Sequence, residues 1–213
     1  MNLDNCRASL EDAGMSGTMN QTTLNHVFFA IKQIVNDSNI ELIDIGHGFS
    51  HVLLFAVICG VCRTSKGIDF NEGANWSIME MVYQATIHRL SKGYWLEILN
   101  GTIERKQGNI CHYRSLQSCF SSWRSCRRVV YTFCTVFEVE AVTHICQLIA
   151  ADPTVVVAVF VPHRKVSVQE MLGILNGFSK GAWQEWESPR RSFTMYASSE
   201  KHQTIILYRS VDH

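Results

Sequence analysis

The chain has 213 residues, of which 46% are hydrophobic and 18% are charged. This is enough apolar material for one domain with a buried core, and only three prolines argue against extensive disorder. Nineteen basic and nineteen acidic residues give a formal net charge of zero. That balance argues against strong general binding to nucleic acid or to an anionic membrane, since both need a clustered basic surface.

Residues 1–19 carry Gly, Ser, Asn and Met without periodicity, and we expect a loosely ordered arm before a single domain over residues 20–213. The arm does not have the basic start and hydrophobic stretch of a signal peptide. The longest apolar run, Val52–Cys62, is too short to span a bilayer. We therefore expect an intracellular protein of the nucleus or cytoplasm that has no membrane partner. Its eight cysteines are then expected to be mostly reduced, buried thiols.

The first predicted element is an amphipathic helix. Apolar residues recur at helical spacing and the pattern ends at the polar run Asn36-Asp37-Ser38. The spaced residues are Leu24, Val27, Phe28, Ile31 and Ile34.

A strand, a glycine turn, a helix and a second strand follow. Ile40–Ile45 is β-branched and almost continuously apolar, which is typical of a strand covered on both faces. The two glycines of Gly46-His47-Gly48 let the backbone turn sharply and approach a ligand. Phe49–Cys62 is expected as a helix whose first N–H groups point back at the turn. The next strand, Lys66–Asp69, places its terminal carboxylate at the sheet edge where ligands bind, and an acid there suits a ribose diol.

The middle of the chain is less clear. Trp76–Leu90 is predicted as a helix, and strand-like patterns occur both in Tyr94–Ile103 and in Asn109–Tyr113. The pattern alone leaves open which of them is the third strand. The inward face of the helix is expected to carry Ile78, Met81, Val82, Ala85 and Leu90.

The last third of the chain contains strong strand patterns. Arg128–Phe133 is a predicted fourth strand, and the unbroken β-branched run Thr154–Val161 indicates a central strand. Helices are predicted over Val139–Ala150, with Val142, Ile145, Cys146 and Ile149 on one face, and over Gln169–Phe178. Trp183–Tyr196 and Gln203–Arg209 follow without an intervening helix, which implies an antiparallel pair.

The unit around the glycine turn resembles the nucleotide-binding half of class I S-adenosylmethionine-dependent methyltransferases. Asp44-Ile45-Gly46-His47-Gly48 matches their first motif and Gly67-Ile68-Asp69 their second. A dinucleotide-binding dehydrogenase fits less well, because His51 stands where G-x-G-x-x-G has its third glycine. The resemblance implies an α/β protein with a three-layer Rossmann-like methyltransferase fold. Its mostly parallel seven-stranded sheet would end in a C-terminal antiparallel hairpin.

The same resemblance implies S-adenosylmethionine as the cofactor and a set of residues that bind it. The family spacing makes Asn109–Tyr113 the third strand, so that Tyr113 and Arg114 reach the adenine edge. Phe70 would stack on the adenine. The remaining cofactor-binding residues would be Asp44, Gly46, Gly48 and Asp69.

Val129–Phe137 and the C-terminal strands look like those of the DOT (disruptor of telomeric silencing) histone lysine methyltransferases. This resemblance implies methyl transfer to a protein lysine or another macromolecular amine, with a histone or nucleosome as partner. Phe133, Phe137 and Tyr208 would then wall a channel for the amine tail. The chain departs from the pattern at Phe133-Cys134, where that family has asparagine, and at Tyr113-Arg114, where an acid usually meets the adenine amine.

Two other functions stay open at this level. The departures, together with the bulk that His47 and Ser50 add to the glycine turn, fit a catalytically degenerate domain that serves as a scaffold or partner subunit. The Rossmann pattern alone also fits an NAD(P)-dependent oxidoreductase. No metal site is predicted, because Cys59-x-x-Cys62 has ligand spacing but no second pair follows at a suitable interval. Its apolar neighbours would raise the thiol pKa rather than lower it, which argues against a redox role.

Overall fold

The computed structural model describes residues 21–37, 39–48, 50–69, 74–90, 102–110, 112–120, 126–135, 137–162, 166–186, 192–194 and 201–210. The predicted arm over residues 1–19, Phe70 and most of Tyr94–Ile103 lie outside these ranges. Within them, the chain alternates strands and helices in the order that a doubly wound α/β fold requires.

The described strands include a seven-stranded sheet in the order β3-β2-β1-β4-β5-β9-β6. The first five of these strands run parallel, whereas β9 is antiparallel to β5 and β6 is antiparallel to β9. The predicted α/β fold with a mostly parallel sheet and an antiparallel end is therefore confirmed. The strands are β1 Ile40–Ile45, β2 Thr64–Asp69, β3 Ile103–Gln107, β4 Arg127–Cys134, β5 Val155–Pro162, β6 Trp183–Glu185 and β9 Ile205–Arg209.

The predicted strand Trp183–Tyr196 is divided in the structure. Its first part is β6, and its later part is β7 (Ser192–Thr194), which pairs with β8 (Lys201–Gln203) in a separate two-stranded sheet. The antiparallel end of the main sheet therefore joins β6 to β9, and β7 and β8 form an additional hairpin between them.

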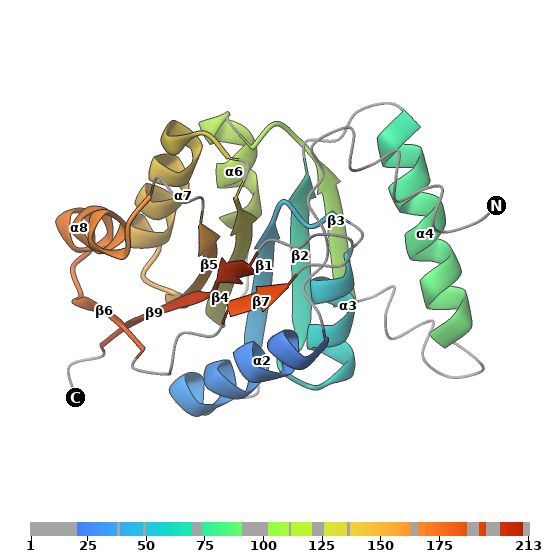
Figure 1. Ribbon diagram of the computed structural model, residues 1–213, viewed down its shortest axis with the longest axis horizontal. Coiled ribbons are helices and arrows are strands. Elements are labelled where there is room, and N and C mark those ends of the chain that lie inside the picture. Colours follow the sequence, from blue (N-terminus) through green and yellow to red (C-terminus); the bar gives the residue numbers. More distant parts are fainter. Residues whose placement is uncertain are drawn as a thin grey trace.

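Helices cover both faces of the main sheet (Figure 1). Helices α6, α7 and α8 lie on one face, and α2 and α3 lie on the other. The remaining helix, α4, packs against α3 and β3 at the edge of the sheet. The helices are α2 Gln21–Val35, α3 His51–Ile58, α4 Ala74–Leu90, α6 Tyr113–Phe120, α7 Val139–Ala151 and α8 Val168–Phe178.

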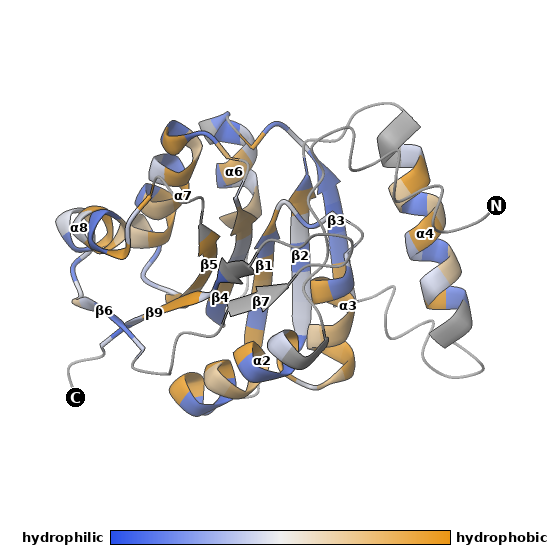
Figure 2. Ribbon diagram, viewed as in Figure 1, coloured by the Kyte–Doolittle hydropathy of each residue, from blue (hydrophilic) through white to orange (hydrophobic). Residues whose placement is uncertain are grey.

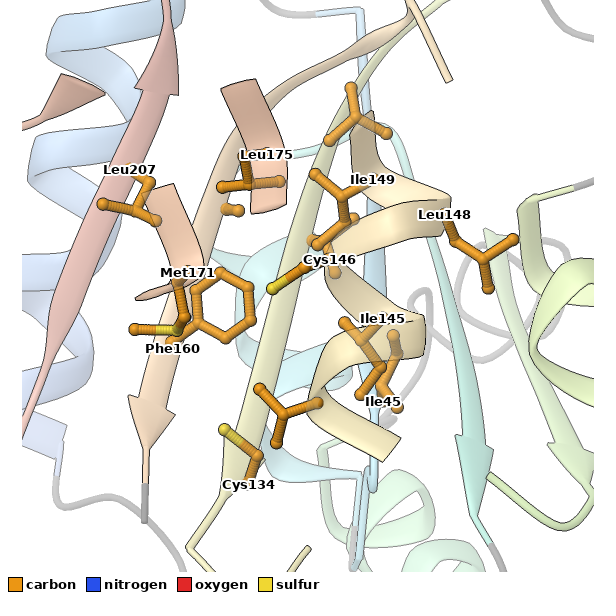
Figure 3. Close-up of a cluster of buried hydrophobic side chains, with 14 of the residues drawn as sticks. Ile45, Cys134, Ile145, Cys146, Leu148, Ile149, Phe160, Met171, Leu175 and Leu207 are labelled. Carbon is orange, nitrogen blue, oxygen red and sulfur yellow. The ribbon is translucent and has the colours of Figure 1, made fainter. Parts of the chain in front are cut away.

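Alternation along the strands divides the core between the two faces. Figure 3 shows Ile45, Cys134 and Phe160 on the face where they meet α7 and α8. Their neighbours in sequence, such as Tyr131 and Phe133, belong to the cluster beneath α2 and α3. The hydrophobic residues gather along the central strands and the inner sides of the helices (Figure 2). The predicted inward residues of α2 and α7 are accordingly buried, apart from Ile34, which is half-buried.

The predicted third strand, Asn109–Tyr113, is wrong. The structure places β3 at Ile103–Gln107, and Tyr113 begins α6. The sequence hides this strand because Glu104, Arg105 and Lys106 give it no apolar pattern. Charged residues are expected there, since β3 is the last strand on its side of the sheet and an edge strand carries charges that oppose further pairing.

The predicted inward face of α4 is right only in part. Ile78 and Val82 are half-buried, and the side chain of Leu90 lies outside the described residues, but the helix turns a different stripe inward. The residues it buries are Met79, Tyr83 and Ile87, one per turn along a narrow stripe. Met81 is 47% exposed instead, and Ala85 is exposed as well. Tyr83 and Ile87 pack against residues of α3 and β3. The sequence suggests a wider apolar face than the stripe that the helix buries.

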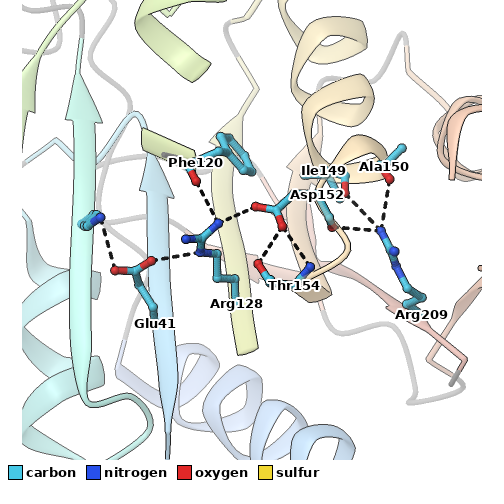
Figure 4. Close-up of polar contacts among 9 residues, drawn as sticks. Glu41, Phe120, Arg128, Ile149, Ala150, Asp152, Thr154 and Arg209 are labelled. Atoms are coloured by element: carbon cyan, nitrogen blue, oxygen red, sulfur yellow. Dashed lines mark hydrogen bonds and ion pairs between the residues drawn. The ribbon is translucent and has the colours of Figure 1, made fainter. Parts of the chain in front are cut away.

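The amino edge of the sheet is closed by a buried ion network (Figure 4). Arg128 Nε donates to Glu41 Oε2 at 3.0 Å, and Nη1 of the same guanidinium donates to Asp152 and to the carbonyl of Phe120. Lys66 Nζ lies 3.3 Å from Glu41 Oε1. These contacts join the starts of β1, β2, β4 and β5, which leaves the opposite, carboxyl edge for ligand contacts.

Candidate functional site

The turn after β1 has the backbone shape that its glycines suggest. Gly46 has φ +80° and Gly48 has φ +48°, both in the left-handed region that residues with a Cβ rarely adopt. Ser50, which precedes α3, also has a positive φ of +63°. The predicted helix Phe49–Cys62 is shorter in the structure, because α3 begins at His51 and ends at Ile58.

Backbone hydrogen bonds hold this turn against β2. The N–H of Gly46 donates to the carbonyl of Ile68 at 2.8 Å. The N–H of Gly48 donates to Oδ2 of Asp69, also at 2.8 Å. The two predicted motifs therefore meet at the carboxyl edge, with the Asp69 carboxylate directed at the turn and not at bulk solvent.

His47 is buried beneath the turn. Its ring lies against Gly67 of β2, where a Cβ would be only 2.5 Å from His47 Cδ2. Nδ1 is 2.9 Å from the carbonyl oxygen of Gly48 and 3.0 Å from Ser50 Oγ. Burial lowers the pKa of His47, and the charge of Arg105 acts in the same direction, whereas the charge of Asp69 opposes it. The imidazole packs against Gly67 on the face of the sheet where Leu53 of α3 also lies.

Asp44 is buried in the last part of β1, between Gly67 on β2 and Tyr131 on β4. It is 1% exposed, and its Oδ1 has no hydrogen-bond partner among the described residues. Burial raises the pKa of Asp44 well above its ordinary value, and the charge of Asp69 raises it further. A cationic ligand group would lower the free-energy cost of ionising the buried carboxyl, so Asp44 suits a cofactor that carries positive charge.

The two glycines of the turn differ in how closely other residues pack against them. A Cβ at Gly46 would be 2.9 Å from Cζ of Phe137, so the ring of Phe137 covers this glycine from the loop after β4. At Gly48, no described atom lies within 4 Å of the corresponding position. The sheet order changes direction between β1 and β4, and this is where open α/β sheets bind ligands. The open backbone at Gly48 and the buried acid Asp44 fit S-adenosylmethionine.

The third strand brings a different segment to the adenine edge than the sequence suggested. Gly108, directly after β3, donates its N–H to the carbonyl of Asp69 at 2.9 Å. Gly108 therefore lies beside Asp69, and the sequence did not indicate it because the third strand was predicted too late in the chain, at Asn109–Tyr113. Arg114 is exposed on α6, and the side chain of Tyr113 lies outside what the structure describes.

The three predicted channel aromatics do not come together. Phe137 packs against the cluster on the α7 face, whereas Phe133 and Tyr208 belong to the α2 face. Phe133 is level with Val161 of β5, and Tyr208 with Val157. Four residues of strand separate these levels by roughly 13 Å. Of the three residues, Phe137 is the one that contacts the glycine turn.

Neither Cys134 nor the Cys59-x-x-Cys62 pair adds to the site. Cys134 is fully buried and its thiol donates to the carbonyl of Val161. Burial raises the pKa of Cys62 to about 12, as its apolar neighbours predicted. In the described ranges there is no group of three His, Cys, Asp or Glu side chains that could hold a metal ion. None of the described helices has the length and apolar character needed to cross a membrane.

Solved structures share this architecture. Mycoplasma capricolum TrmK, solved with S-adenosyl-homocysteine, matches with a TM-score of 0.53 at 13% identity over 90% of this chain and 70% of its own. Streptococcus pneumoniae Sp1610, described as a candidate tRNA (m1A22) methyltransferase, matches with a TM-score of 0.55 at 11% identity over 92% and 72%. The methyltransferase domain of bacterial CtHen1-CN matches with a TM-score of 0.58 at 14% identity over 90% and 100%.

The chain has the Rossmann-like methyltransferase fold. The predicted class I fold is thus confirmed, and the narrower resemblance to DOT enzymes stays a prediction. No protein-family model matches the sequence, and no curated protein matches it. At the low identities of the solved structures, the shared property is the fold, and the residues of the site must carry the functional argument.

Proposed function

We propose that this chain binds S-adenosylmethionine at the glycine turn and transfers its methyl group to a ring nitrogen of an RNA base. The observation that carries the cofactor assignment is the 2.8 Å bond from the Gly48 N–H to Asp69, next to open space above Gly48. That arrangement holds an acid and a bare backbone together at the edge where a ribose and its substituents would bind.

The chain contributes binding and orientation. S-adenosylmethionine supplies an activated methyl group on a sulfonium. Asp69 would accept hydrogen bonds from the ribose hydroxyls, the segment after β3 would border the adenine, and Asp44 would face the positive end of the cofactor. Phe137 would exclude water above Gly46. Holding two reactants in line accounts for about 7–11 kcal/mol of barrier lowering in well-oriented reactions.

Among the described residues of the turn there is no accessible base, which argues for an acceptor that does not need one. The described acids and histidine at the turn, Asp44, His47 and Asp69, are 1%, 5% and 7% exposed, and Asp69 already accepts from the Gly48 N–H. A lysine ammonium must lose its proton before it attacks a methyl group. A ring nitrogen of a nucleobase already has an available lone pair at neutral pH, so it fits this site better than the amine expected from the sequence.

Charge and fold similarity agree with an RNA acceptor. Lys106 of β3 and Arg114 of α6 lie on either side of the segment next to Asp69, and both are at least partly exposed. They would provide local phosphate contacts on a chain of zero net charge, although Lys106 Nζ also lies 3.0 Å from Glu104 Oε1. Among the structures with this fold, Sp1610 is described as a candidate tRNA methyltransferase.

Calorimetry with S-adenosylhomocysteine tests the cofactor assignment. We expect binding by the wild type and at least a tenfold loss in Asp69→Ala, because that variant loses both the acid and the acceptor of the Gly48 N–H. Asp37→Ala is the matched control, since Asp37 is an exposed acid that accepts from the N–H of Asn39 far from the turn. Preference for NAD(H) or NADP(H) over S-adenosylhomocysteine would instead select the oxidoreductase.

Transfer of labelled methyl groups identifies the acceptor. Total tRNA, free histones and reconstituted nucleosomes should be compared under one set of conditions. We expect label in RNA, located on a base by nucleoside analysis. Label in histone lysines would replace RNA with the protein acceptor that the sequence resemblance implied.

A noncatalytic domain is the second candidate, and Phe137 is the observation that favours it. Its ring covers Gly46, where the methionine end of a cofactor would approach. If neither the wild type nor Phe137→Ala binds S-adenosylhomocysteine, the domain is a scaffold for reasons other than this ring. Binding by Phe137→Ala alone would show that this ring closes an otherwise competent site.

A further inference from the structure

The turn between β1 and α3 suits its two glycines but is strained at Ser50. Gly46, Gly48 and Ser50 all have positive φ, and Ser50 is not a glycine. A residue with a Cβ in this region costs about 1–2 kcal/mol. Some other group must therefore hold Ser50 in place, and the side chain between the glycines contacts both Gly48 and Ser50.

His47 makes that contact through one nitrogen. Nδ1 lies 2.9 Å from the carbonyl oxygen of Gly48 and 3.0 Å from Ser50 Oγ, and the carbonyl of His47 accepts from the N–H of Ser50 at 2.7 Å. A carbonyl oxygen only accepts hydrogen bonds, so Nδ1 must carry the proton. The neutral imidazole is therefore the Nδ1–H tautomer, which donates to Gly48 and leaves Ser50 Oγ beside the same proton.

Gly67 makes room for this imidazole. A Cβ at position 67 would be 2.5 Å from Cδ2 and 2.8 Å from Cγ of His47, and 2.7 Å from Cδ1 of Leu53. Ordinary side-chain contacts are not this short. A residue of β2 and a residue of the turn thus have complementary sizes, with the ring occupying the volume that a side chain at position 67 would need.

We propose that His47 is a positioning residue whose Nδ1–H holds the cofactor turn in its conformation, and that Gly67 leaves the space in β2 that the imidazole occupies. The hydrogen bond of His47 keeps the Gly48 N–H directed at Asp69 and keeps the backbone of Gly48 accessible to a ligand. The effect on the cofactor rests on the proposed function, whereas the effect on the turn does not.

Two substitutions at His47 separate the effect of its hydrogen bond from the effect of its side-chain volume. His47→Asn retains a donor near the position of Nδ1, and His47→Leu fills the space without a donor. We expect His47→Leu to weaken S-adenosylhomocysteine binding roughly tenfold, the upper range for one lost hydrogen bond, and His47→Asn to restore most of it. His26→Asn, at an exposed histidine of α2, is the control and should bind as the wild type does.

Gly67→Ala approaches the same contact from β2. The added methyl group should displace the His47 ring and reproduce the His47→Leu loss of binding. Gly173→Ala is its matched control, because Gly173 lies on helix α8 with nothing within 4 Å of the added Cβ. Equal effects of the two alanines would contradict a specific fit between Gly67 and His47.

Two measurements need no cofactor. Nitrogen NMR of the His47 ring should show the proton on Nδ1, and amide hydrogen exchange at Gly48 and Ser50 should speed up in His47→Leu and Gly67→Ala but not in His47→Asn. A proton on Nε2, or unchanged exchange in His47→Leu, would overturn the proposal. Wild-type protein that shows the expected tautomer and exchange but binds no S-adenosylhomocysteine would refute the proposed function, while the positioning role of His47 in the turn would still stand.

Discussion

The backbone N–H of Gly48 donates a 2.8 Å hydrogen bond to Oδ2 of Asp69, 21 residues further along the chain. The bond joins the turn after β1 to the end of β2, and the Gly46 N–H adds a second link to Ile68. The acid and the bare backbone are therefore oriented before a ligand arrives. Such preorganisation reduces the ordering cost of binding, which makes this edge a better ligand site than its few polar side chains would suggest.

Asp44→Asn should stabilise the free protein at neutral pH. Burial raises the pKa of Asp44, so above its ordinary value of 3.8 the folded state holds a proton that the unfolded state has released. Wild-type stability consequently falls as pH rises from about 4 toward the folded pKa, and the amide removes this contribution. Urea unfolding from pH 4 to pH 8 should show an advantage for Asp44→Asn that grows with pH. The same variant should bind S-adenosylhomocysteine more weakly, and an advantage that shrinks with pH would contradict the assignment.

His47 should make the protein sensitive to mild acid. Burial lowers its pKa, so between the folded value and the unfolded value of about 6.5 the unfolded chain binds the extra proton. Its contribution to stability is complete above that window and is lost as pH falls through it. The difference in unfolding free energy between wild type and His47→Asn should therefore decline from pH 7 to pH 5. A constant difference over this range would show that the imidazole does not titrate on unfolding.

The central parallel strands and the glycine turn were predictable because their signals are local. Ile40–Ile45 is apolar throughout, the two glycines interrupt it, and Asp69 ends the next strand. The edge strand β3 was not predictable, because its position depends on pairing with β2 and its residues are charged. The sequence pattern therefore predicts buried strands better than strands at the border of the sheet.

Side-chain neighbours within the site were less predictable than its backbone. The fit between His47 and Gly67 links residues of two elements, and neither has a pattern that indicates the other. The separation of the three aromatics predicted to wall a channel was unpredictable for a related reason. Tyr208 lies on an antiparallel strand whose register places it level with Val157, and that register cannot be derived from spacing alone.

Arg128→Met should strongly destabilise the fold. The guanidinium is buried and bonded to Glu41 and Asp152, so its removal leaves two carboxylates without their main cation. Breaking a buried ion pair from one side typically costs about 3–5 kcal/mol. Urea denaturation should show a loss in this range, whereas Arg127→Met, at the exposed neighbour that donates to the carbonyl of Val35, should lose about 1 kcal/mol. Similar losses in the two variants would mean that the network contributes little.

Gly46→Ala should destabilise the protein through its backbone. With φ at +80°, a Cβ costs about 1–2 kcal/mol, and the added carbon also meets Phe137 Cζ at 2.9 Å. Thermal unfolding of Gly46→Ala with and without Phe137→Leu separates the two causes, and we expect the second change to recover only a minor part. Gly173→Ala, within helix α8, should shift stability in the opposite direction by about 0.5–1 kcal/mol. Full recovery by Phe137→Leu would assign the cost to the ring contact instead.

Ser50 should tolerate glycine better than alanine. Its φ of +63° strains any residue with a Cβ, and its hydroxyl lies 3.0 Å from His47 Nδ1. Alanine keeps the strain and loses the hydrogen bond, so Ser50→Ala should lose about 0.5–1.5 kcal/mol. Glycine also loses the bond but relieves about 1–2 kcal/mol of strain, which offsets most of the loss. At Ser118, on helix α6, the order should reverse, because glycine costs about 1 kcal/mol relative to alanine within a helix. Denaturant unfolding of the four variants checks both orders, and an alanine at position 50 that is more stable than glycine would show that the turn is not strained there.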